Sequence, residues 1–383
     1  MKIQIINGSI FTPQGWTNGG SLFCEEGKIV EISNDNSHRD GWEVVNAEGL
    51  IIGPGGIDMH IHGGGGHDFM ECTEEAFRTV IATHMQHGTT TLFPTLASSS
   101  NTMIRQAAEI CTRLMLEEHS PVAGLHLEGP YFNIRKCGGQ WPEMIRLADP
   151  EEYIALLDAF PCIRRWDAAP ELPGALDFGK ECARRGVLVA LGHTEADYDA
   201  VTNGFASGFT HATHFYNAMT GVHNIREFKH AGTIESVLIT DGITVEVIAD
   251  GIHVPPVLLH LVRKVKGTAN IALVTDAMAP AGSDSDATFD KNTIIEDGVA
   301  KLADRSALAG SIATMDRLVD TIINRCGMSW DDAFTMTAST PARIMHIDDR
   351  KGSIALGKDA DICIYSPSAQ LKYVIQAGII HRA

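Results

Sequence analysis

The sequence is poor in basic residues and carries no dense set of cysteines. It has 30 Lys and Arg against 48 Asp and Glu, which gives a formal net charge of -18. This balance argues against nonspecific nucleic-acid binding, because phosphates are neutralised by basic side chains. The 8 cysteines form no Cys-x-x-Cys pair, an arrangement typical of reduced thiols in the cytoplasm. We therefore expect a cytoplasmic protein, with Cys111, Cys162 and Cys182 packed in its core.

Long apolar runs are also absent. No stretch approaches the roughly 18 apolar residues that a membrane span requires. The N-terminal run MKIQIINGSIF is interrupted by Asn7, Gly8 and Ser9, which argues against a signal peptide. The composition, 44% hydrophobic and 20% charged over 383 residues, is that of a globular chain with a large core.

The chain contains segments of two different sequence patterns. Residues 1–53 and 348–383 contain short strands joined by turns, and we expect them to form a small β-sandwich domain built from both chain ends. Residues 54–347 alternate apolar strands with helical stretches, which favours a parallel sheet with crossover helices. The expected strands are 55–63, 88–96, 122–130, 164–171, 186–194, 209–217, 244–253 and 270–278. Eight strands close a (β/α)8 TIM barrel, so an α/β fold with a barrel catalytic domain is predicted.

Polar residues gather at the expected C-terminal ends of these strands, where barrel active sites lie. They are His60, His62, Glu128, His193, His214 and Asp276. His60 and His62 share a face, because side chains repeat every second residue along a strand. His211 and His214 differ by three positions, so only one is expected to face inward. We choose His214, which lies nearer the strand end.

These residue types favour a metal site. Imidazole and carboxylate are the usual ligands of zinc, and a catalytic zinc keeps one position for water, whose pKa it lowers to about 7. Asp276 is suited to act as an unligated acid/base that takes the water's proton and returns it to a leaving group. For His60 and His62 alone, a role as buried hydrogen-bonded histidines is nearly as well supported as ligation, and for Glu128, His193 or His214 taken singly a structural role is favoured. Their joint occurrence at five strand ends favours the metal.

Two neighbouring features have simpler interpretations. The run Gly63 to Gly66 could be only a flexible loop, but beside metal ligands we expect it to let backbone approach the metal and the substrate closely. His84 and His87 lie near a helix C-terminus before Gly88. There, an interaction with the helix macrodipole is favoured over metal ligation.

A series of motifs extends over nearly the whole chain: PGGIDMHIHGGGG, GLHLEGPYFN, GHTEADYDA, THATHFYNAM, VIADGIHV, LVTDAMAPAG, LAGSIATMD and GSIALGKDADICI. Together they resemble the N-acetylglucosamine-6-phosphate deacetylase family of the amidohydrolase superfamily. The resemblance implies a main metal bound by Glu128, His193 and His214. It also implies a second metal at His60 and His62 with Glu128 bridging, and Asp276 as the catalytic acid/base. No predicted strand ends in a lysine that could be carboxylated, which favours this pattern over hydantoinase-like or dihydroorotase-like relatives.

The cofactor implied is a divalent metal, one or two per subunit. Zinc is expected, and iron, manganese or cobalt are compatible with the same ligands. The resemblance also implies a set of substrate-binding residues: Gly139, Gln140, Asn217, Ala218, Arg226, Asp250, Gly251, Ile252, His253, Leu308, Ala309 and Gly310. His253 is further implied in catalysis, where it would help to polarise the acetyl carbonyl.

Arg226 bears on two predictions, phosphate binding and oligomeric state. It lies in HNIREFKHAG, a basic stretch of an otherwise acidic chain, and its planar guanidinium suits a phosphate. Taken by itself, a solvated surface arginine would be the favoured interpretation. In the family the matching arginine reaches the substrate of the neighbouring subunit, so a homodimer is implied.

Two departures from the family pattern concern substrate binding. The segment KCGGQWP places Gln140 where a substrate-contacting histidine often stands, and REFKHAG replaces a commoner Arg-Glu-Pro-Gly opening after Arg226. The expected reaction is deacetylation of N-acetyl-D-glucosamine 6-phosphate to D-glucosamine 6-phosphate and acetate, in amino-sugar catabolism. Two alternatives are a deacetylase of another sugar, such as N-acetylgalactosamine 6-phosphate, and a catalytically silent amidohydrolase-like assembly module.

Overall fold

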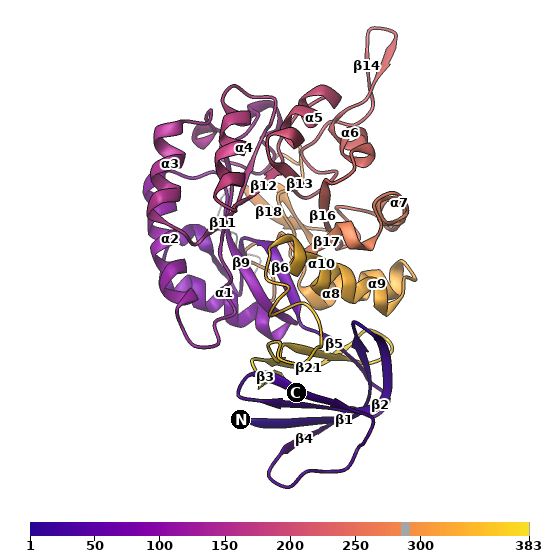
Figure 1. Ribbon diagram of the computed structural model, residues 1–383. Coiled ribbons are helices and arrows are strands. Elements are labelled where there is room, and N and C mark those ends of the chain that lie inside the picture. The colour runs from indigo at the N-terminus through magenta and orange to yellow at the C-terminus, as the bar shows by residue number, and fades with distance from the viewer. Residues whose placement is uncertain (285–291, 383) are drawn as a thin grey trace.

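Eight parallel strands form a barrel in the computed structural model, which describes residues 1–284 and 292–382 (Figure 1). The strands are β6 (Gly56–Ile61), β9 (Thr89–Leu96), β10 (Leu125–Tyr131), β11 (Ile163–Ala168), β12 (Leu188–Leu191), β13 (Phe209–Ala212), β16 (Thr244–Ile248) and β17 (Ile271–Val274). Each strand pairs with the next along the chain. One strand overlaps each of the eight predicted ranges, so the predicted barrel is confirmed.

The first and last barrel strands are joined through the ends that carry the candidate site. The backbone N–H of Asp276, just after β17, donates to the carbonyl of His60 in β6 at 3.0 Å. The Thr275 hydroxyl donates to Asp58 Oδ2 at 2.6 Å. Burial raises the pKa of Asp58 to about 7, although these hydrogen bonds act to lower it. The closure of the barrel therefore fixes Asp276 beside the histidines of β6.

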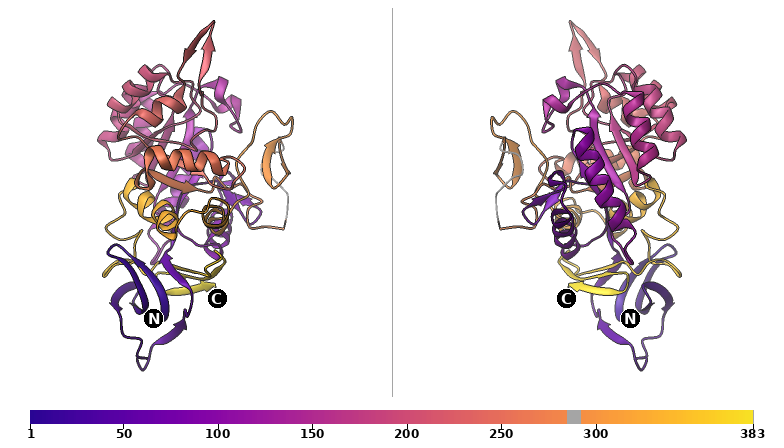
Figure 2. Two further views of the ribbon diagram at one scale, coloured as in Figure 1. Left: turned by 90° about the vertical axis from the view of Figure 1, so that its right-hand side faces the viewer. Right: turned by 90° about the vertical axis from the view of Figure 1, so that its left-hand side faces the viewer.

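Helices cover the outside of the barrel (Figure 2). They are α1 (Glu74–Gln86), α2 (Asn101–Met115), α3 (Pro150–Ala159), α4 (Ala175–Arg184), α5 (Tyr198–Ala206), α6 (Thr233–Ile239), α7 (Pro256–Lys266), α8 (Met315–Asp320), α9 (Trp330–Phe334) and α10 (Thr340–Ile344). Thr73, Ser100 and Asp197 cap α1, α2 and α5 by accepting a backbone N–H of the first turn, as such residues do at helix starts. Within residues 1–284 and 292–382, every helix is too short or too polar to cross a lipid bilayer.

Apolar side chains fill the layer between strands and helices. Trp166 of β11 stacks on Tyr131 at a centroid distance of 5.6 Å, and Phe178 of α4 meets Trp166 edge-on at 5.3 Å. The three cysteines expected in the core, Cys111, Cys162 and Cys182, are all buried. Burial on this scale is the main stabilising contribution in a domain of this size.

Both chain ends build the second domain. Its strands are β1 (Lys2–Thr12), β2 (Gly15–Glu25), β3 (Lys28–Ser33), β4 (Glu43–Asn46), β5 (Ile51–Pro54), β20 (Ile362–Tyr365), β21 (Leu371–Gln376) and β22 (Ile379–Arg382). The N- and C-terminal segments join where β5 pairs antiparallel with β20, with Gly53 opposite Cys363. The predicted small β-sandwich from both ends is thus observed, around a core of isoleucines. Domain boundaries at residues 53 and 348 stay a prediction.

The remaining elements are short. Among the described residues, three two-stranded hairpins lie outside the two large sheets: β7 (Gly63–Gly64) with β8 (His67–Asp68), β14 (His223–Ile225) with β15 (Phe228–His230), and β18 (Thr293–Glu296) with β19 (Val299–Leu302). Single turns of 3-10 helix occupy Phe69–Glu71, Ile134–Lys136, Pro142–Met144 and Thr268–Asn270, and π-helical turns occupy Thr321–Arg325 and Thr335–Ser339. The β14–β15 hairpin projects from the barrel on the side away from the small domain (Figure 2).

Candidate metal centre

Three side chains from neighbouring strands converge on one point. The Nε2 atoms of His193 and His214 each lie 3.0 Å from Glu128 Oε1 and 3.1 Å from one another. These separations are close to the edges of a ligand tetrahedron with bonds of about 2.0–2.2 Å. All three residues are buried. The structure therefore brings the predicted main ligand set together.

The hydrogen bonds of His193 show that this arrangement fits a cation. Its Nδ1 lies 2.7 Å from the carbonyl oxygen of Lys136, and a carbonyl can only accept, so Nδ1 carries the proton. In the neutral ring, Nε2 then presents a lone pair, and this lone pair faces the Glu128 carboxylate. Two acceptors at such a distance repel unless a positive charge lies between them. A metal ion with imidazole and carboxylate ligands would satisfy both groups.

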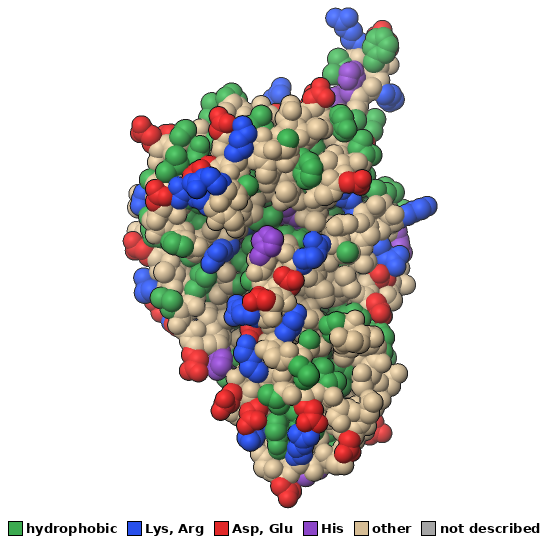
Figure 3. Space-filling view, viewed as in Figure 1, with side chains coloured by type: hydrophobic (Ala, Val, Ile, Leu, Met, Phe, Trp, Pro, Cys, Tyr) green, Lys and Arg blue, Asp and Glu red, His purple; other side chains and the backbone are tan. Residues whose placement is uncertain are grey.

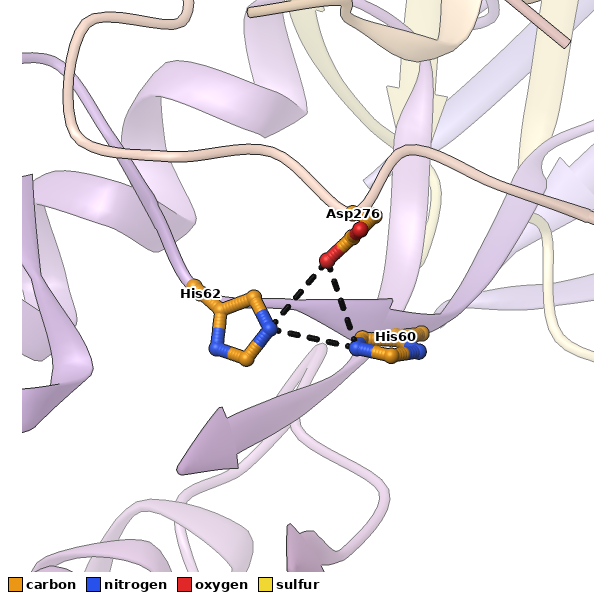
Figure 4. A group of neighbouring side chains, drawn as sticks. All are labelled: His60, His62 and Asp276. Atoms are coloured by element: carbon orange, nitrogen blue, oxygen red, sulfur yellow. Dashed lines mark hydrogen bonds and ion pairs between the residues drawn. The ribbon is translucent and has the colours of Figure 1, made fainter. Parts of the chain in front are cut away.

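His60, His62 and Asp276 form a second group of converging side chains (Figure 4). The Nε2 atoms of His60 and His62 are 3.1 Å apart, and they lie 3.3 Å and 3.2 Å from Asp276 Oδ1. Glu128 Oε2 is 3.2 Å from His62 Nε2, so the two oxygens of one carboxylate face the two groups. Asp276 lies among the atoms of the second group. Its predicted role as an unligated acid/base thus stays a prediction.

The carboxylates of this centre are ionised. Burial by itself acts to raise the pKa of Glu128, but the facing imidazoles His60, His193 and His214 outweigh it and hold that pKa well below its usual range. Burial acts to lower the pKa of His62, but the neighbouring carboxylates Asp276 and Glu128 raise it to about 10. Glu128 and Asp276 are thus both ionised, and a bound cation would take the place of the protons that the facing histidines otherwise carry.

Unusual backbone conformations aim several of these side chains. His193, His214 and Asp276 all have positive φ, at 44°, 27° and 47°. Such left-handed residues cost roughly 1–3 kcal/mol each and cluster at functional sites. In each case the chain has just left its barrel strand, and the turn directs the side chain toward the centre.

The expectation that only one of His211 and His214 faces inward is wrong. His211 Nδ1 lies 2.7 Å from Thr244 Oγ1 inside the barrel, and its Nε2 lies 3.3 Å from Glu246 Oε2. His214 reaches Glu128 one layer above. The two-residue alternation ends with β13 at Ala212, so it does not govern His214.

A fully buried ionic network beneath the centre was not predicted. Arg165 of β11 donates to Asp167 Oδ1 at 2.9 Å and to Glu246 Oε1 of β16 at 3.0 Å. Glu246 Oε1 also accepts the backbone N–H of His214 at 2.9 Å and lies 2.6 Å from His60 Nδ1. His126 lies near enough to His60 and Asp167 to share a cation with them, but Asp167 is already paired with Arg165. The sequence signal that could have revealed this network is the presence of charged residues at alternate positions of buried strands, such as Arg165 and Asp167 in β11.

A pocket of about 490 Å³ opens above the metal centre, within the size range of small-molecule sites. Predicted residues in its wall include Gly139, Gln140, Asn217, Ala218, His253, Leu308, Ala309 and Gly310, together with His62, Glu128, His193, His214 and Asp276. Asp68, Arg135, Lys136 and Trp141 also line it and were not predicted.

Three predicted substrate-binding residues lie outside the pocket wall and support His253, which is part of it. Asp250, Gly251 and Ile252 are not among the described residues that line the pocket. Asp250 Oδ1 accepts the N–H groups of Ile252 and His253 at 2.8 Å each, and its Oδ2 lies 2.8 Å from His253 Nδ1. This turn therefore holds His253 in place. The predicted direct contact of Asp250, Gly251 and Ile252 with substrate stays a prediction.

Comparison with known proteins places the chain in a family. The protein-family model described as "Amidohydrolase family" matches residues 51–381 of this chain. The N-acetylglucosamine-6-phosphate deacetylase of Bacillus subtilis (strain 168) is 30% identical over 380 residues, which covers 97% of this chain and 95% of that protein. The chain belongs to the N-acetylglucosamine-6-phosphate deacetylase family of amidohydrolases. The family is metal-dependent, in agreement with the two groups of ligands described above.

Two further relatives of this deacetylase family bear on the site. The crystal structure of N-acetylglucosamine-6-phosphate deacetylase from Pasteurella multocida has a TM-score of 0.93 at 28% identity and covers 99% of both chains. An N-acetylgalactosamine-6-phosphate deacetylase of Shewanella sp. (strain ANA-3) is 29% identical over 309 residues, covering 80% of this chain and 77% of that protein. Both names describe hydrolysis of phosphorylated amino sugars.

Arg226 lies away from the pocket of its own chain. It occupies the tip of the β14–β15 hairpin with φ at 55°, and it is exposed. Basic, histidine and hydrophobic side chains cover this hairpin (Figure 3). Ile225 and Phe228 are 53% and 62% exposed, unusual for large apolar residues on a projecting element.

The structure gives the glycine loop and His84 packing roles that the sequence did not predict. None of the residues Gly63 to Gly66 is found in the described pocket wall. Instead, a Cβ on Gly63 would lie 2.6 Å from the Ala279 nitrogen, and one on Gly64 would lie 2.6 Å from His84 Nε2. The glycines therefore allow close packing, Gly63 against the segment after β17 and Gly64 against α1. Burial lowers the pKa of His84 to about 4, so this histidine is neutral and offers no charge to the macrodipole. Its Nε2 instead donates to the Gly63 carbonyl at 2.9 Å.

Proposed function

We propose that this chain hydrolyses N-acetyl-D-glucosamine 6-phosphate to D-glucosamine 6-phosphate and acetate. The observation that carries the proposal is the Glu128 carboxylate, which directs one oxygen to each histidine group at the base of a sugar-sized pocket. The names and full-length coverage of the deacetylase relatives support the substrate class. The scattered cysteines support a cytoplasmic location.

We assign Glu128, His193 and His214 to the first metal, and His60 and His62 with bridging Glu128 to a second. Zinc is the proposed metal, because it is commonly bound by imidazole and carboxylate in hydrolases. When bound, the metal would polarise the acetyl carbonyl and lower the pKa of a water molecule. One or two ions per subunit are compatible with the two adjacent groups.

Asp276 moves the proton in this proposal. Its carboxylate faces the second histidine group with Oδ1 and lines the pocket. The water oxygen bonds to the acetyl carbon while Asp276 takes a water proton. The carbon–nitrogen bond then breaks as Asp276 gives that proton to the amine nitrogen, and the free amino sugar departs. The second water proton stays on the acetic acid product, which ionises to acetate.

His253 would assist at the acetyl oxygen. Its Nδ1 hydrogen-bonds to Asp250, which fixes the ring and leaves Nε2 for the substrate. A protonated imidazole held in this way donates from Nε2 to the carbonyl oxygen, where negative charge develops. We assign Gly139, Gln140, Asn217, Ala218 and the backbone of Leu308 to Gly310 to the sugar and phosphate, with Asp250 to Ile252 shaping their surroundings.

We further propose a homodimer in which Arg226 reaches the phosphate in the neighbouring subunit's pocket. The hairpin that carries Arg226 projects from its own barrel (Figure 1), and its exposed Ile225 and Phe228 would be covered by a second copy. Remote phosphate binding would hold the acetamide at the metal, where orientation lowers the barrier.

Acetate release from a panel of N-acetyl hexosamine 6-phosphates, with metal content measured on the same sample, tests the function. We expect turnover of the glucosamine derivative, loss of turnover with chelator, and recovery with added zinc. The galactosamine epimer is the second candidate, favoured by the Shewanella relative. A higher kcat/KM for that epimer would select it. Full metal loading with no acetate release from any sugar would instead indicate a silent assembly module.

A further inference from the structure

Gln140 is held at both ends of its side chain. Its Oε1 accepts the backbone N–H of Ser98 at 2.6 Å, and its Nε2 donates to Glu128 Oε2 at 2.7 Å. The residue is 7% exposed, so water competes little for these hydrogen bonds. The bond to Glu128 has an ionised acceptor, which makes it stronger than a bond between neutral groups.

The loop that carries Gln140 is fixed as well. The N–H of Gln140 donates to the Cys137 carbonyl at 3.1 Å, and Cys137 Sγ donates to the Gln140 carbonyl at 3.0 Å. One turn earlier, the Lys136 carbonyl accepts from His193 Nδ1 at 2.7 Å. The same loop therefore holds two residues of the first group. The carbonyl of Lys136 holds His193, and the side chain of Gln140 holds Glu128.

Gln140 contacts the Glu128 oxygen that faces the second group. Oε1 lies 3.0 Å from the Nε2 atoms of His193 and His214, whereas Oε2 lies 3.2 Å from His62 Nε2. A carboxylate that turns about its terminal bond presents its oxygens at other angles. A donor fixed at Oε2 opposes that rotation and leaves a second lone pair of Oε2 for a cation.

We propose that Gln140 is a positioning residue that locks the Glu128 carboxylate in the orientation that bridges the two cation sites. The inference rests on the proposed function, because it takes Glu128 as a metal ligand. It also narrows the role predicted from the sequence, in which Gln140 contacts the sugar. One N–H and one oxygen lone pair of Gln140 remain for such a contact, so the two roles need to be separated by experiment.

The substitution Gln140→Met separates them, because methionine keeps the volume and removes both hydrogen bonds. Gln376→Met is the matched control. Gln376 lies in β21 of the small domain and is also buried. Its Nε2 donates to the His119 carbonyl at 2.8 Å. Zinc affinity is measured without substrate by competition with a chromophoric chelator. We expect a loss of about 10- to 100-fold for Gln140→Met and wild-type affinity for Gln376→Met.

Two further readouts complete the test. The visible absorption spectrum of the cobalt-loaded protein reports ligand geometry, and we expect it to change in Gln140→Met only. At saturating metal, KM for N-acetyl-D-glucosamine 6-phosphate should remain near its wild-type value while kcat falls. Unchanged zinc affinity and cobalt spectrum together with a raised KM would overturn the proposal in favour of a sugar contact. Since the metal titration needs no substrate, its result stands even if the chain proves not to be a deacetylase.

Discussion

His60 Nδ1 lies 2.6 Å from Glu246 Oε1, and both side chains are fully buried in the barrel. Burial acts to raise the pKa of Glu246, but Arg165 and His60 hold it well below its usual range. The ionised carboxylate accepts the Nδ1–H of His60 and thereby fixes the ring, so Nε2 is the atom presented to Asp276 and His62 and would carry the lone pair for a metal. A residue outside the pocket wall thereby sets the tautomer and direction of a proposed metal ligand.

Removal of Glu246 should destabilise the fold. Glu246→Ala leaves Arg165 in the barrel interior with Asp167 as its one carboxylate partner among the described residues. Breaking a buried ion pair from one side costs about 3–5 kcal/mol, and we expect a loss of this size in urea unfolding of the metal-free protein. Glu31→Ala removes the exposed partner of Arg39 and should cost less than about 1 kcal/mol. Equal losses in the two variants would contradict the argument.

Asp276 should be needed for turnover more than for substrate binding. Asp276→Asn keeps the shape of the side chain but cannot take a proton from water. We expect kcat for acetate release to fall by about 10²- to 10⁴-fold, with sugar phosphate binding retained by calorimetry. Metal content is measured on the same sample, since Asp276 lies among the atoms of the second group. Full activity would refute the acid/base role.

Arg226 should act on phosphate binding. Arg226→Ala should raise KM for the phosphorylated sugar on the order of 10- to 100-fold, the value of a charge-assisted hydrogen bond. It should lower kcat less. Lys229→Ala, on the same exposed hairpin, is the control and should leave KM near wild type. An unchanged KM in Arg226→Ala would remove this residue from the phosphate site.

Mixing two impaired variants, assayed at a substrate concentration where Arg226→Ala alone has little activity, tests whether the arginine acts across subunits. A heterodimer of Arg226→Ala with Asp276→Asn contains one pocket with an intact Asp276 and an arginine from its partner. After subunit exchange we expect recovery of about a quarter of wild-type activity, since half of the dimers are mixed and each has one complete site. No recovery after verified exchange would place Arg226 in its own subunit's site.

His84 should make stability depend on pH. Burial, helped by His87 and opposed by Asp316 and the Gly63 hydrogen bond, lowers the His84 pKa from 6.5 to about 4. The unfolded chain therefore binds the proton more readily, and stability falls as the pH decreases from about 6.5 to about 4, by at most about 3 kcal/mol. His84→Gln should flatten this part of the stability curve in urea unfolding, whereas exposed His38→Gln should not. Parallel curves for wild type and His84→Gln would contradict the assignment.

Much of the architecture could be predicted from local patterns. Alternating strands and helices gave eight strands at their observed places, because hydrophobic periodicity and turn residues are local signals. The convergence of Glu128, His193 and His214 followed from one rule about where parallel strands end. The orientation of His211 and His214 did not follow, because the left-handed turn at His214 breaks the alternation on which that inference depended.

The sequence by itself determined the barrel, the small domain from the two chain ends, and the residue types that meet at the barrel mouth. Only the tertiary structure decided which partners those residues have: Glu246 beneath His60, Gln140 on Glu128, and the glycines against Ala279 and His84. The physical reason is distance along the chain. Periodicity is set by neighbouring residues, whereas hydrogen bonds and ion pairs in a closed barrel join strands that are far apart in sequence and become neighbours only when the ring forms.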